Sequence, residues 1–390
     1  MENLTDSSES LPDQAEVCGM NSAQAGRQIA RAAGIVMLAY VFSTLVGIVR
    51  GMVVSHAFGT SASLDSFNAA NRVTELLFNL TAGGALGSAF IPMFTGYLTR
   101  KDARGAWRLA SGVVNSVLVV LVAVSALMWL FAPVLVERGL FALVTDSSLG
   151  QVAETARLLR MMLPTVIIFG ISGLVMGMLN AHQVFLLPAL APAAYSLGII
   201  LGVWLLPASL GIDRLAIGTL IGAGGHLLLQ LPALFRLPER SYQLAAGFRD
   251  EAVRKVLRLM LPRVFGAGIV QLNFVANTII SLSLGAGSAS ALIWAFTLML
   301  MPQAAIAQST GTASLPTLSA QVELGKRDDF RQTLSGIMRV MLLLALPATV
   351  GLALLRVPLV RVLYEHGNFD ATSTQMVAWA LLWYALGLTG

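Results

Sequence analysis

Long apolar stretches are the feature that most limits what this chain can fold into. Residues 113–136 and 338–355 run almost without a charge, and each is long enough to cross a bilayer as a helix of about 20 residues. In hydrocarbon every backbone N–H and C=O must be paired inside the protein, so only helices or a closed barrel can span it. Barrel strands would alternate over about ten residues. Because 56% of the residues are hydrophobic and 12% charged, we expect an all-α polytopic membrane protein.

Ten apolar segments result when the sequence is cut at charged, glycine-rich or proline-rich breaks. They are residues 28–58, 64–98, 106–134, 152–180, 186–207, 213–236, 254–284, 288–322, 330–356 and 373–390. With a cytoplasmic N-terminus, the inside loops would hold Arg100, Lys101, Arg104, Arg236, Arg240, Arg249, Arg254, Lys255, Lys326 and Arg327. The outside loops would hold chiefly Arg138, Arg214 and Arg361. Because basic residues concentrate in cytoplasmic loops, we expect a multi-pass chain in the bacterial cytoplasmic membrane with its N-terminus inside.

Both ends of the chain differ from the apolar segments between them. Residues 1–27 form a polar, partly acidic tail without the basic start, apolar run and cleavage site of a signal peptide, which predicts a disordered cytoplasmic extension. The tenth segment stops without a flanking charge. We therefore expect the chain to be a fragment of a longer protein.

An internal repeat joins the second and third segments to the eighth and ninth. Residues 88–95 align with residues 312–319, a basic loop follows in each copy, and Ser111-Gly112 then aligns with Ser335-Gly336. The copies lie six segments apart, so both should run in the same direction and be related by an axis along the membrane normal. This predicts two pseudo-symmetric helical lobes around a central cavity, with a first lobe of six helices at residues 28–236 and an incomplete second lobe of four at 251–390.

A polar stripe marks the second segment. Asp65, Asn68, Arg72, Glu75 and Asn79 follow one another at spacings of three and four, which places them on one face of a helix. Ionisable groups inside a membrane face a wet cavity or protein partners and not lipid. We expect the stripe to line a solvated space between the lobes. The alternative is a structural ion pair between Arg72 and Glu75, with Asp65 capping a helix start.

Further polar positions in apolar segments are also candidates for the cavity. Arg50 lies within the first segment, although it could also reach the interface. Arg263 follows Pro262 in the seventh segment and is similarly ambiguous. Asn273, Asn277 and Ser281 recur further along that segment at spacings of four, and either a cavity role or hydrogen bonding between helices would explain them.

Motifs of enzymes and of metal, cofactor or nucleic-acid sites are not found in the sequence. The four histidines are scattered without metal-ligand spacing or a paired carboxylate. The glycines of residues 59–87 neither follow a strand nor end in a Lys-Ser/Thr pair, which excludes a phosphate-binding loop. The net charge of +5 comes from residues in loops, where membrane orientation explains it better than nucleic acid does. We expect a transporter that requires no metal or cofactor.

Several stretches together resemble the MurJ/MviN family of lipid II flippases, within a superfamily that includes multidrug and polysaccharide exporters. They are residues 43–50, 58–59, 64–67, 82–92, 311–318 and 363–369. The resemblance runs from about residue 28 to the end of the chain. It implies a fold of fourteen helices, of which ten would be present here.

The resemblance also implies which residues hold the substrate, since basic cavity residues in the family are thought to bind the diphosphate and sugars of lipid II. Arg50, Asp65 and Arg72 match family positions that carry arginine, aspartate and a basic residue. The chain departs from the family pattern at five positions where charged residues are usual, namely Thr44, Gly51, Phe78, Gly83 and Thr297. These departures favour the fold over the substrate as the better-supported part of the resemblance.

The function expected from residues and resemblance together is flipping of a lipid-linked peptidoglycan precursor by alternating access. The candidate substrate-binding residues are Arg50, Asp65, Asn68, Arg72, Glu75, Asn79, Arg263 and Asn277. The expected partners are the anionic lipid-linked precursor, membrane lipids and cell-wall synthesis proteins. The departures leave two alternatives open: an exporter of another polyprenyl-linked saccharide or amphiphile, and a transport-inactive scaffold for cell-wall synthesis.

Overall fold

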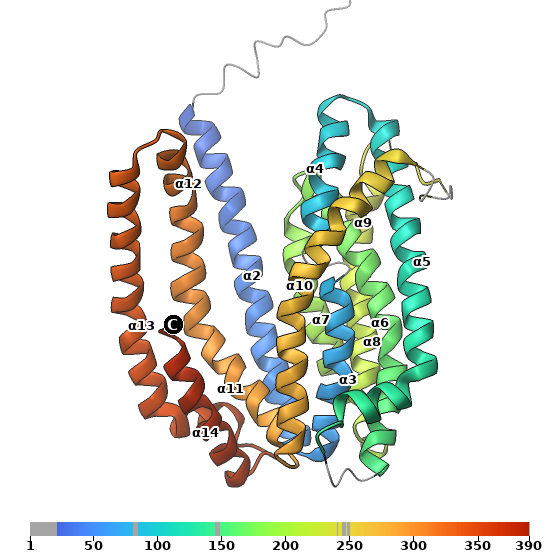
Figure 1. Cartoon of the computed structure of the whole chain (residues 1–390), viewed down its shortest axis with the longest axis vertical. Coiled ribbons are helices and arrows are strands. Elements are labelled where there is room, and N and C mark those ends of the chain that lie inside the picture. The colour runs from blue at the N-terminus through green and yellow to red at the C-terminus, as the bar shows by residue number, and fades with distance from the viewer. Residues whose placement is uncertain are drawn as a thin grey trace, which may run out of the picture.

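Helices make up almost the whole of the computed structural model, which describes residues 22–80, 85–144, 149–239, 241–243, 247 and 250–389 (Figure 1). The described residues contain no strand. The α-helices are α2 (Ser22–Phe58), α3 (Ala62–Phe78), α4 (Ala85–Thr99), α5 (Ala103–Leu135), α6 (Leu149–Ala181), α7 (Leu186–Leu205), α8 (Asp213–Leu228), α9 (Leu231–Phe235), α10 (Glu251–Ser283), α11 (Ser288–Gln303), α12 (Ser309–Glu323), α13 (Arg327–Tyr364) and α14 (Ala371–Gly387). Short irregular turns of helix follow α5, α7 and α11 at Val136–Leu140, Ala208–Leu210 and Ala304–Gln308.

Each of the ten predicted apolar segments corresponds to one helix or to helices that follow one another. The second segment is divided into α3 and α4, and the eighth into α11 and α12. In the described part of the chain, eight helices are long and apolar enough to cross a membrane. The chain is therefore an all-α membrane protein, as predicted. Residues 1–21 of the predicted tail lie outside the described residues. Residues 22–27 already belong to α2, so the helix begins earlier in the chain than the predicted end of the tail at residue 27.

The two copies of the repeat have the same local structure. α4 and α12 both end in a left-handed residue, Lys101 with φ 58° and Gly325 with φ 68°. At each end the left-handed residue donates its N–H to the carbonyl three residues back, and the next residue donates to the carbonyl five back. That arrangement satisfies carbonyls that a helix C-terminus leaves unpaired. Both turns lie at the top of Figure 1, so the copies run in the same direction, as predicted.

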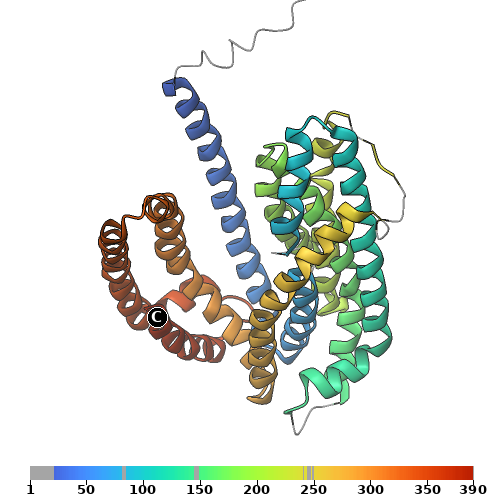
Figure 2. The same cartoon turned by 45° about the horizontal axis from the view of Figure 1, so that its top comes forward.

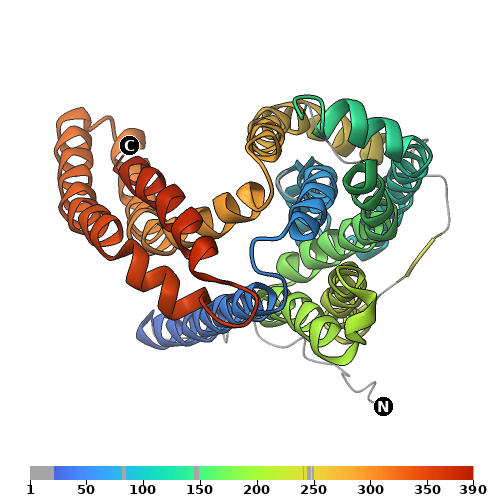
Figure 3. The same ribbon diagram turned by 90° about the horizontal axis from the view of Figure 1, so that it is seen from below.

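Two groups of helices are visible when the molecule is tilted or seen from below (Figures 2 and 3). One group contains α11–α14, the other contains α3–α9, and α2 runs between them while packing along α7. α10 packs against α3 and α4 as well as α11, although the sequence assigned it to the second lobe. The lobe boundary at residue 251 stays a prediction.

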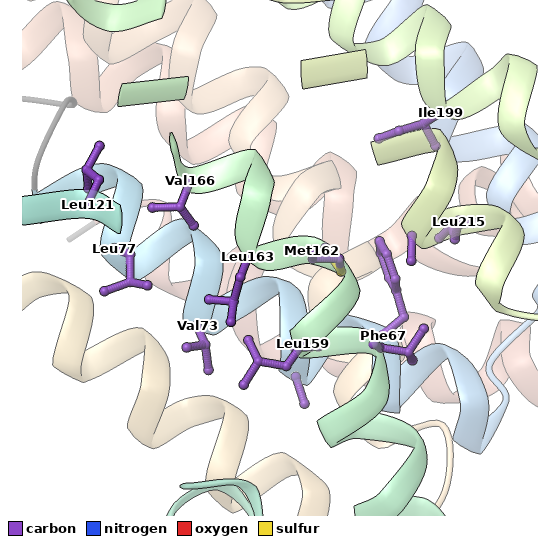
Figure 4. Close-up of a cluster of buried hydrophobic side chains, with 14 of the residues drawn as sticks. Phe67, Val73, Leu77, Leu121, Leu159, Met162, Leu163, Val166, Ile199 and Leu215 are labelled. Carbon is purple, nitrogen blue, oxygen red and sulfur yellow. The ribbon is translucent and has the colours of Figure 1, made fainter. Parts of the chain in front are cut away.

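The core of the first lobe forms where α3 packs on α6 (Figure 4). Phe67, Val73 and Leu77 of α3 meet Leu159 and other apolar residues of α6, and all four of these named residues are buried. The apolar face of α3 is thus used for packing on α6. The polar residues of the stripe lie on another face of α3.

Glycines bring α7 and α8 into contact through their backbones. A Cβ at Gly198 would lie 2.2 Å from the Cα of Gly222, and one at Gly202 would lie 2.5 Å from the Cα of Gly218. Small residues allow such close approach between helices in membranes, where packing and not water exclusion drives association. α2 packs along α7 of this pair.

The loops after α2 and α13 join the two groups of helices at one end of the molecule. Asn368 donates its backbone N–H to the carbonyl of His56 (2.9 Å) and its side-chain amide to the carbonyl of Ala57 (2.7 Å). Thr60 and Ser373 share a hydrogen bond of 2.7 Å between their hydroxyls. In the same loop, hydrogen bonds from Thr374 and Arg361 lower the pKa of Glu365. These contacts close this end of the structure.

Candidate functional site

A cavity of about 710 Å³ lies between the two groups of helices. α2, α3, α7 and α8 line it from one side, and α11 and α13 line it from the other. Its charged lining residues are Arg50 from α2 and Arg72 and Glu75 from α3. Two guanidinium groups and one carboxylate give this lining a net charge of +1. The cavity can therefore attract an anionic group.

Arg72 and Glu75 form an ion pair within the cavity wall. Arg72 Nη1 lies 2.7 Å from Glu75 Oε2, and Asn71 donates its amide to Glu75 Oε1 at 3.0 Å. The Arg72 side chain also lies over the ring of Phe274, 5.1 Å from its centroid. The stripe was interpreted either as a cavity lining or as a structural ion pair. Arg72 and Glu75 are both, because they form an ion pair and also line the cavity.

Arg50 is held differently. Among the residues that the structure describes, no carboxylate lies within ion-pair distance of it. Its guanidinium lies 5.8 Å from the centre of the Tyr195 ring, which provides a cation–π contact. A cation without a carboxylate partner favours the binding of an anion. Of the two arginines that line the cavity, Arg50 is the one without a carboxylate partner among the described residues.

Asp65 lies elsewhere than predicted. It was expected to face the solvated space, but its side chain is 1% exposed and does not line the cavity. Its carboxylate accepts the backbone N–H groups of Gly287 (2.6 Å) and Ser290 (2.7 Å) and the hydroxyl of Ser290 (2.6 Å). Asp65 therefore caps the N-terminus of α11 and ties it to α3, where free N–H groups and the helix dipole favour a negative charge.

Asn68 contacts both the cavity and α11. It lines the cavity, and its side-chain amide donates to the hydroxyl of Ser290 at 3.1 Å. Asn79 does not line the cavity. It ends α3, with its backbone N–H directed to the carbonyls of Glu75 and Leu76. The polar stripe thus reaches the cavity only in its middle.

Arg263 and Asn277 are not brought to the cavity. Both are exposed residues of α10, and neither is among the lining residues. Asn277 donates to the side chain of Asn273 at 3.0 Å, one turn earlier on the same helix. The structure therefore places these two residues outside this cavity.

Aromatic residues of the cavity were missed by the sequence analysis. Tyr195, Trp294 and Tyr364 all line it. Each lies in a different apolar segment, and nothing in the sequence distinguishes it from an aromatic residue that packs in the core or faces lipid. Three positions at which the chain departs from the family pattern also line it, namely Thr44, Gly51 and Thr297. Phe78 instead packs on Phe169, with ring centroids 5.2 Å apart, and Gly83 lies outside the described residues.

A second cavity, of about 800 Å³, lies at the opposite end from the α2–α3 loop, between α4, α5 and α10. Its charged lining residues are Arg100, Asp102, Arg108, Asp250, Glu251 and Lys255. Arg108 is paired with Asp250 at 2.9 Å. The three positive and three negative groups balance, so this cavity has no preference for an anion. In the described part of the chain, no cluster of His, Cys, Asp or Glu is arranged to hold a metal ion.

Comparison with known proteins gives consistent results for sequence and structure. The family described as "Lipid II flippase MurJ" matches residues 54–390. The chain is 30% identical over 356 residues to the lipid II flippase MurJ of Burkholderia cenocepacia, covering 90% of this chain and 68% of that protein. It is 31% identical over 370 residues to a probable lipid II flippase MurJ of Bdellovibrio bacteriovorus, covering 93% and 69%.

Solved structures are similar over nearly the same extent. A lipid II flippase MurJ in an inward closed conformation has a TM-score of 0.77 and 26% identity, covering 91% of this chain and 72% of that one. An inward-facing multidrug resistance MATE family transporter of the MOP superfamily has a TM-score of 0.69 and 17% identity, covering 91% and 82%. The second similarity concerns the fold alone.

Proposed function

Because this chain belongs to the lipid II flippase MurJ family, we propose that it moves a lipid-linked peptidoglycan precursor of the lipid II type across the bacterial cytoplasmic membrane by alternating access. The observation that carries the proposal is the cavity between the two groups of helices, with Arg50 unpaired by any described carboxylate. A flippase needs a polar site inside the membrane that accepts an anionic head group and later releases it.

Arg50 and Arg72 bind the diphosphate of the precursor in this proposal. Hydrogen bonds to charged groups contribute about 1.5–3 kcal/mol each, more than neutral ones. Glu75 holds Arg72 in position through the 2.7 Å ion pair. It also limits the affinity, because the carboxylate competes with the diphosphate for the same guanidinium. A site that must also release its ligand benefits from that competition.

The contact between Asp65 and α11 closes one end of the cavity in the proposed cycle. Opening that end requires α11 to withdraw its two backbone N–H groups and the Ser290 hydroxyl from Asp65. The hydrogen bonds of Asn368 and Thr60 at the loops must break as well. These contacts join helices that line the cavity, so their breakage changes access to it.

The orientation proposed is a cytoplasmic N-terminus. The α4–α5 and α12–α13 turns, which carry Arg100, Lys101, Lys326 and Arg327, lie at one end of the molecule (Figure 1). The positive-inside rule makes that end cytoplasmic, so the contact at Asp65 is at the outer end. Outward movement of an anion is then favoured by an inside-negative potential by about 2.3 kcal/mol per charge per 100 mV.

A second candidate function is transport of another polyprenyl-linked saccharide. The observation in its favour is the composition of the cavity, in which Thr44, Gly51 and Thr297 are uncharged and the cations are Arg50 and Arg72. A ligand with less negative charge than a diphosphate-linked sugar would need fewer cations. The two candidates differ in substrate and share the same cavity and cycle.

Complementation of a flippase-depleted bacterium tests the proposal, together with lipid II flipping assayed in spheroplasts. The variants are Arg50→Ala and Arg72→Ala, with the exposed Arg263→Ala as the matched control. We expect normal membrane abundance, normal flipping for the control and at least tenfold less flipping for each cavity variant. Growth without lipid II flipping would contradict the proposal. No complementation and no lipid II flipping by the unaltered chain, with normal abundance, would refute the proposal and leave the second candidate and a scaffold as the alternatives.

A further inference from the structure

Trp294 combines burial in the cavity wall with an unused hydrogen-bond donor. Its side chain is 9% exposed, and it lines the cavity from α11. Its indole Nε1 is buried and has no hydrogen-bond partner among the residues that the structure describes. An indole N–H can only donate, and a buried donor without an acceptor is unfavourable. An acceptor supplied by a ligand would remove that cost.

The other polar residue that α11 directs to the cavity has already used its donor. Thr297 donates its hydroxyl to the carbonyl of Ile293 at 2.8 Å. The remaining α11 residues in the wall are apolar, for example Leu300 and Met301. Trp294 is therefore the one α11 side chain lining this cavity, within the described chain, whose donor has no partner.

The ring of Trp294 is fixed by its neighbours. The Tyr364 ring lies with its centroid 5.0 Å from that of Trp294. On the α2 side, a Cβ at Gly51 would come within 3.3 Å of Trp294 Cζ3, so the backbone of α2 already lies close to the ring. A side chain confined on both sides loses little freedom when it binds, which favours a specific contact over an adaptable one.

A second unused donor comes from the facing helix. Arg72 Nε is also buried without a hydrogen-bond partner in the described part of the chain, although its Nη1 is paired with Glu75. Arg72 and Trp294 line the same cavity from α3 and α11, which belong to different groups of helices. A ligand rich in acceptor oxygens and negatively charged could use both donors at once.

We propose that Trp294 is a substrate-binding residue whose indole N–H donates to an oxygen of the ligand's diphosphate, opposite the guanidinium groups of Arg50 and Arg72. The inference rests on the proposed function for the identity of the ligand. It adds a contact from α11, so that the anionic group is bound from both sides of the cavity.

Binding of lipid II and of undecaprenyl diphosphate to the purified chain tests the inference. Trp294→Phe keeps an aromatic ring but removes the N–H together with part of the indole, so the same change at a second buried tryptophan is needed as a control. Trp107→Phe is the matched control, because Trp107 is 5% exposed and also has a buried Nε1 without a described partner, but it does not line this cavity. We expect Trp294→Phe to weaken the Kd for both probes about tenfold or more, as for a hydrogen bond to a charged acceptor, and Trp107→Phe to leave it unchanged.

The outcomes separate this inference from the proposed function. If the unaltered chain binds lipid II and Trp294→Phe binds it equally well, the inference is wrong and the proposed function stands. An equal loss in Trp107→Phe, or a loss for lipid II without one for undecaprenyl diphosphate, would also overturn it, because the effect would then be structural or directed to the sugars. If the unaltered chain binds neither probe, the proposed function fails and the inference with it.

Discussion

Replacing Asp65 with alanine should weaken the closed end of the molecule. The carboxylate accepts three short hydrogen bonds from Gly287 and Ser290 and is 1% exposed. It also lies in the first turn of α3, so the positive ends of two helices favour its charge. Alanine would leave two backbone N–H groups of α11 without an acceptor in a site closed to water.

The magnitude follows from those three bonds. Hydrogen bonds to a charged group contribute about 1.5–3 kcal/mol each, but bonds to one carboxylate are not additive, so we expect a loss of about 3–5 kcal/mol. Since 1.4 kcal/mol corresponds to a factor of ten, the equilibrium between closed and open ends should shift more than a hundredfold. Asp65→Asn should have a smaller effect, because its amide oxygen still accepts while its NH2 group faces donors.

Disulfide formation across the closed end measures this shift. Thr60 and Ser373 lie on opposite sides of the contact, with hydroxyl oxygens 2.7 Å apart, and the chain has one native cysteine, Cys18. A Cys18→Ser, Thr60→Cys, Ser373→Cys protein should form the disulfide rapidly, and adding Asp65→Ala should slow its formation strongly. Ser63→Ala is the matched control, since Ser63 lies in the same turn but bonds Glu154 within the first lobe. Equal rates with and without Asp65→Ala would refute the reasoning.

Three further predictions concern stability and can be checked by thermal unfolding in detergent and by membrane abundance. Gly222→Leu should destabilise the α7–α8 pair by about 3 kcal/mol or more, because its Cβ would lie 2.4 Å from the Tyr195 carbonyl, whereas Gly224→Leu, with open space around it, should not. Gly59→Ala should lower the unfolding midpoint and loosen the α2–α3 loop, since φ is +57° and a Cβ would meet the Asn368 carbonyl at 2.3 Å. Ser172→Ala should cost about 1–3 kcal/mol, because Ser172 bonds both His226 (2.7 Å) and Gln230 (2.8 Å) inside the first lobe.

The polar stripe shows how far helical spacing can be used to predict a site. Spacing correctly placed Asn68, Arg72 and Glu75 on the cavity side of α3. It could not predict that the first turn of that helix, with Asp65, would meet the N-terminus of α11. Free N–H groups and water both satisfy a buried carboxylate, so sequence alone does not distinguish them. The site therefore covers less of the stripe than its spacing indicated.

The aromatic residues show the opposite limit. Trp294 lines the cavity, whereas Trp379 and Trp383 of α14 are 61% and 60% exposed, yet all three are tryptophans in apolar segments. Lipid and protein interiors are similarly apolar, so the hydrophobic pattern of a membrane helix does not predict which of its faces packs on another helix and which faces lipid. The repeat was more informative, because the turns after α4 and α12 preserve both their positions and their hydrogen bonds.

The contact at the closed end and the ligand grip proposed for the cavity use the same pair of helices. Asp65 and Arg72 are two turns apart on α3, and Ser290 and Trp294 are one turn apart on α11. A ligand held between Arg72 and Trp294 would draw these helices together, which favours the closed end. A ligand shifts such an equilibrium only by its difference in affinity between the two states. Release therefore requires that the ligand lose its contact with Arg72 or with Trp294 as the outer end opens. Glu75 is paired with Arg72 at 2.7 Å, so its carboxylate can replace the ligand at the Arg72 guanidinium.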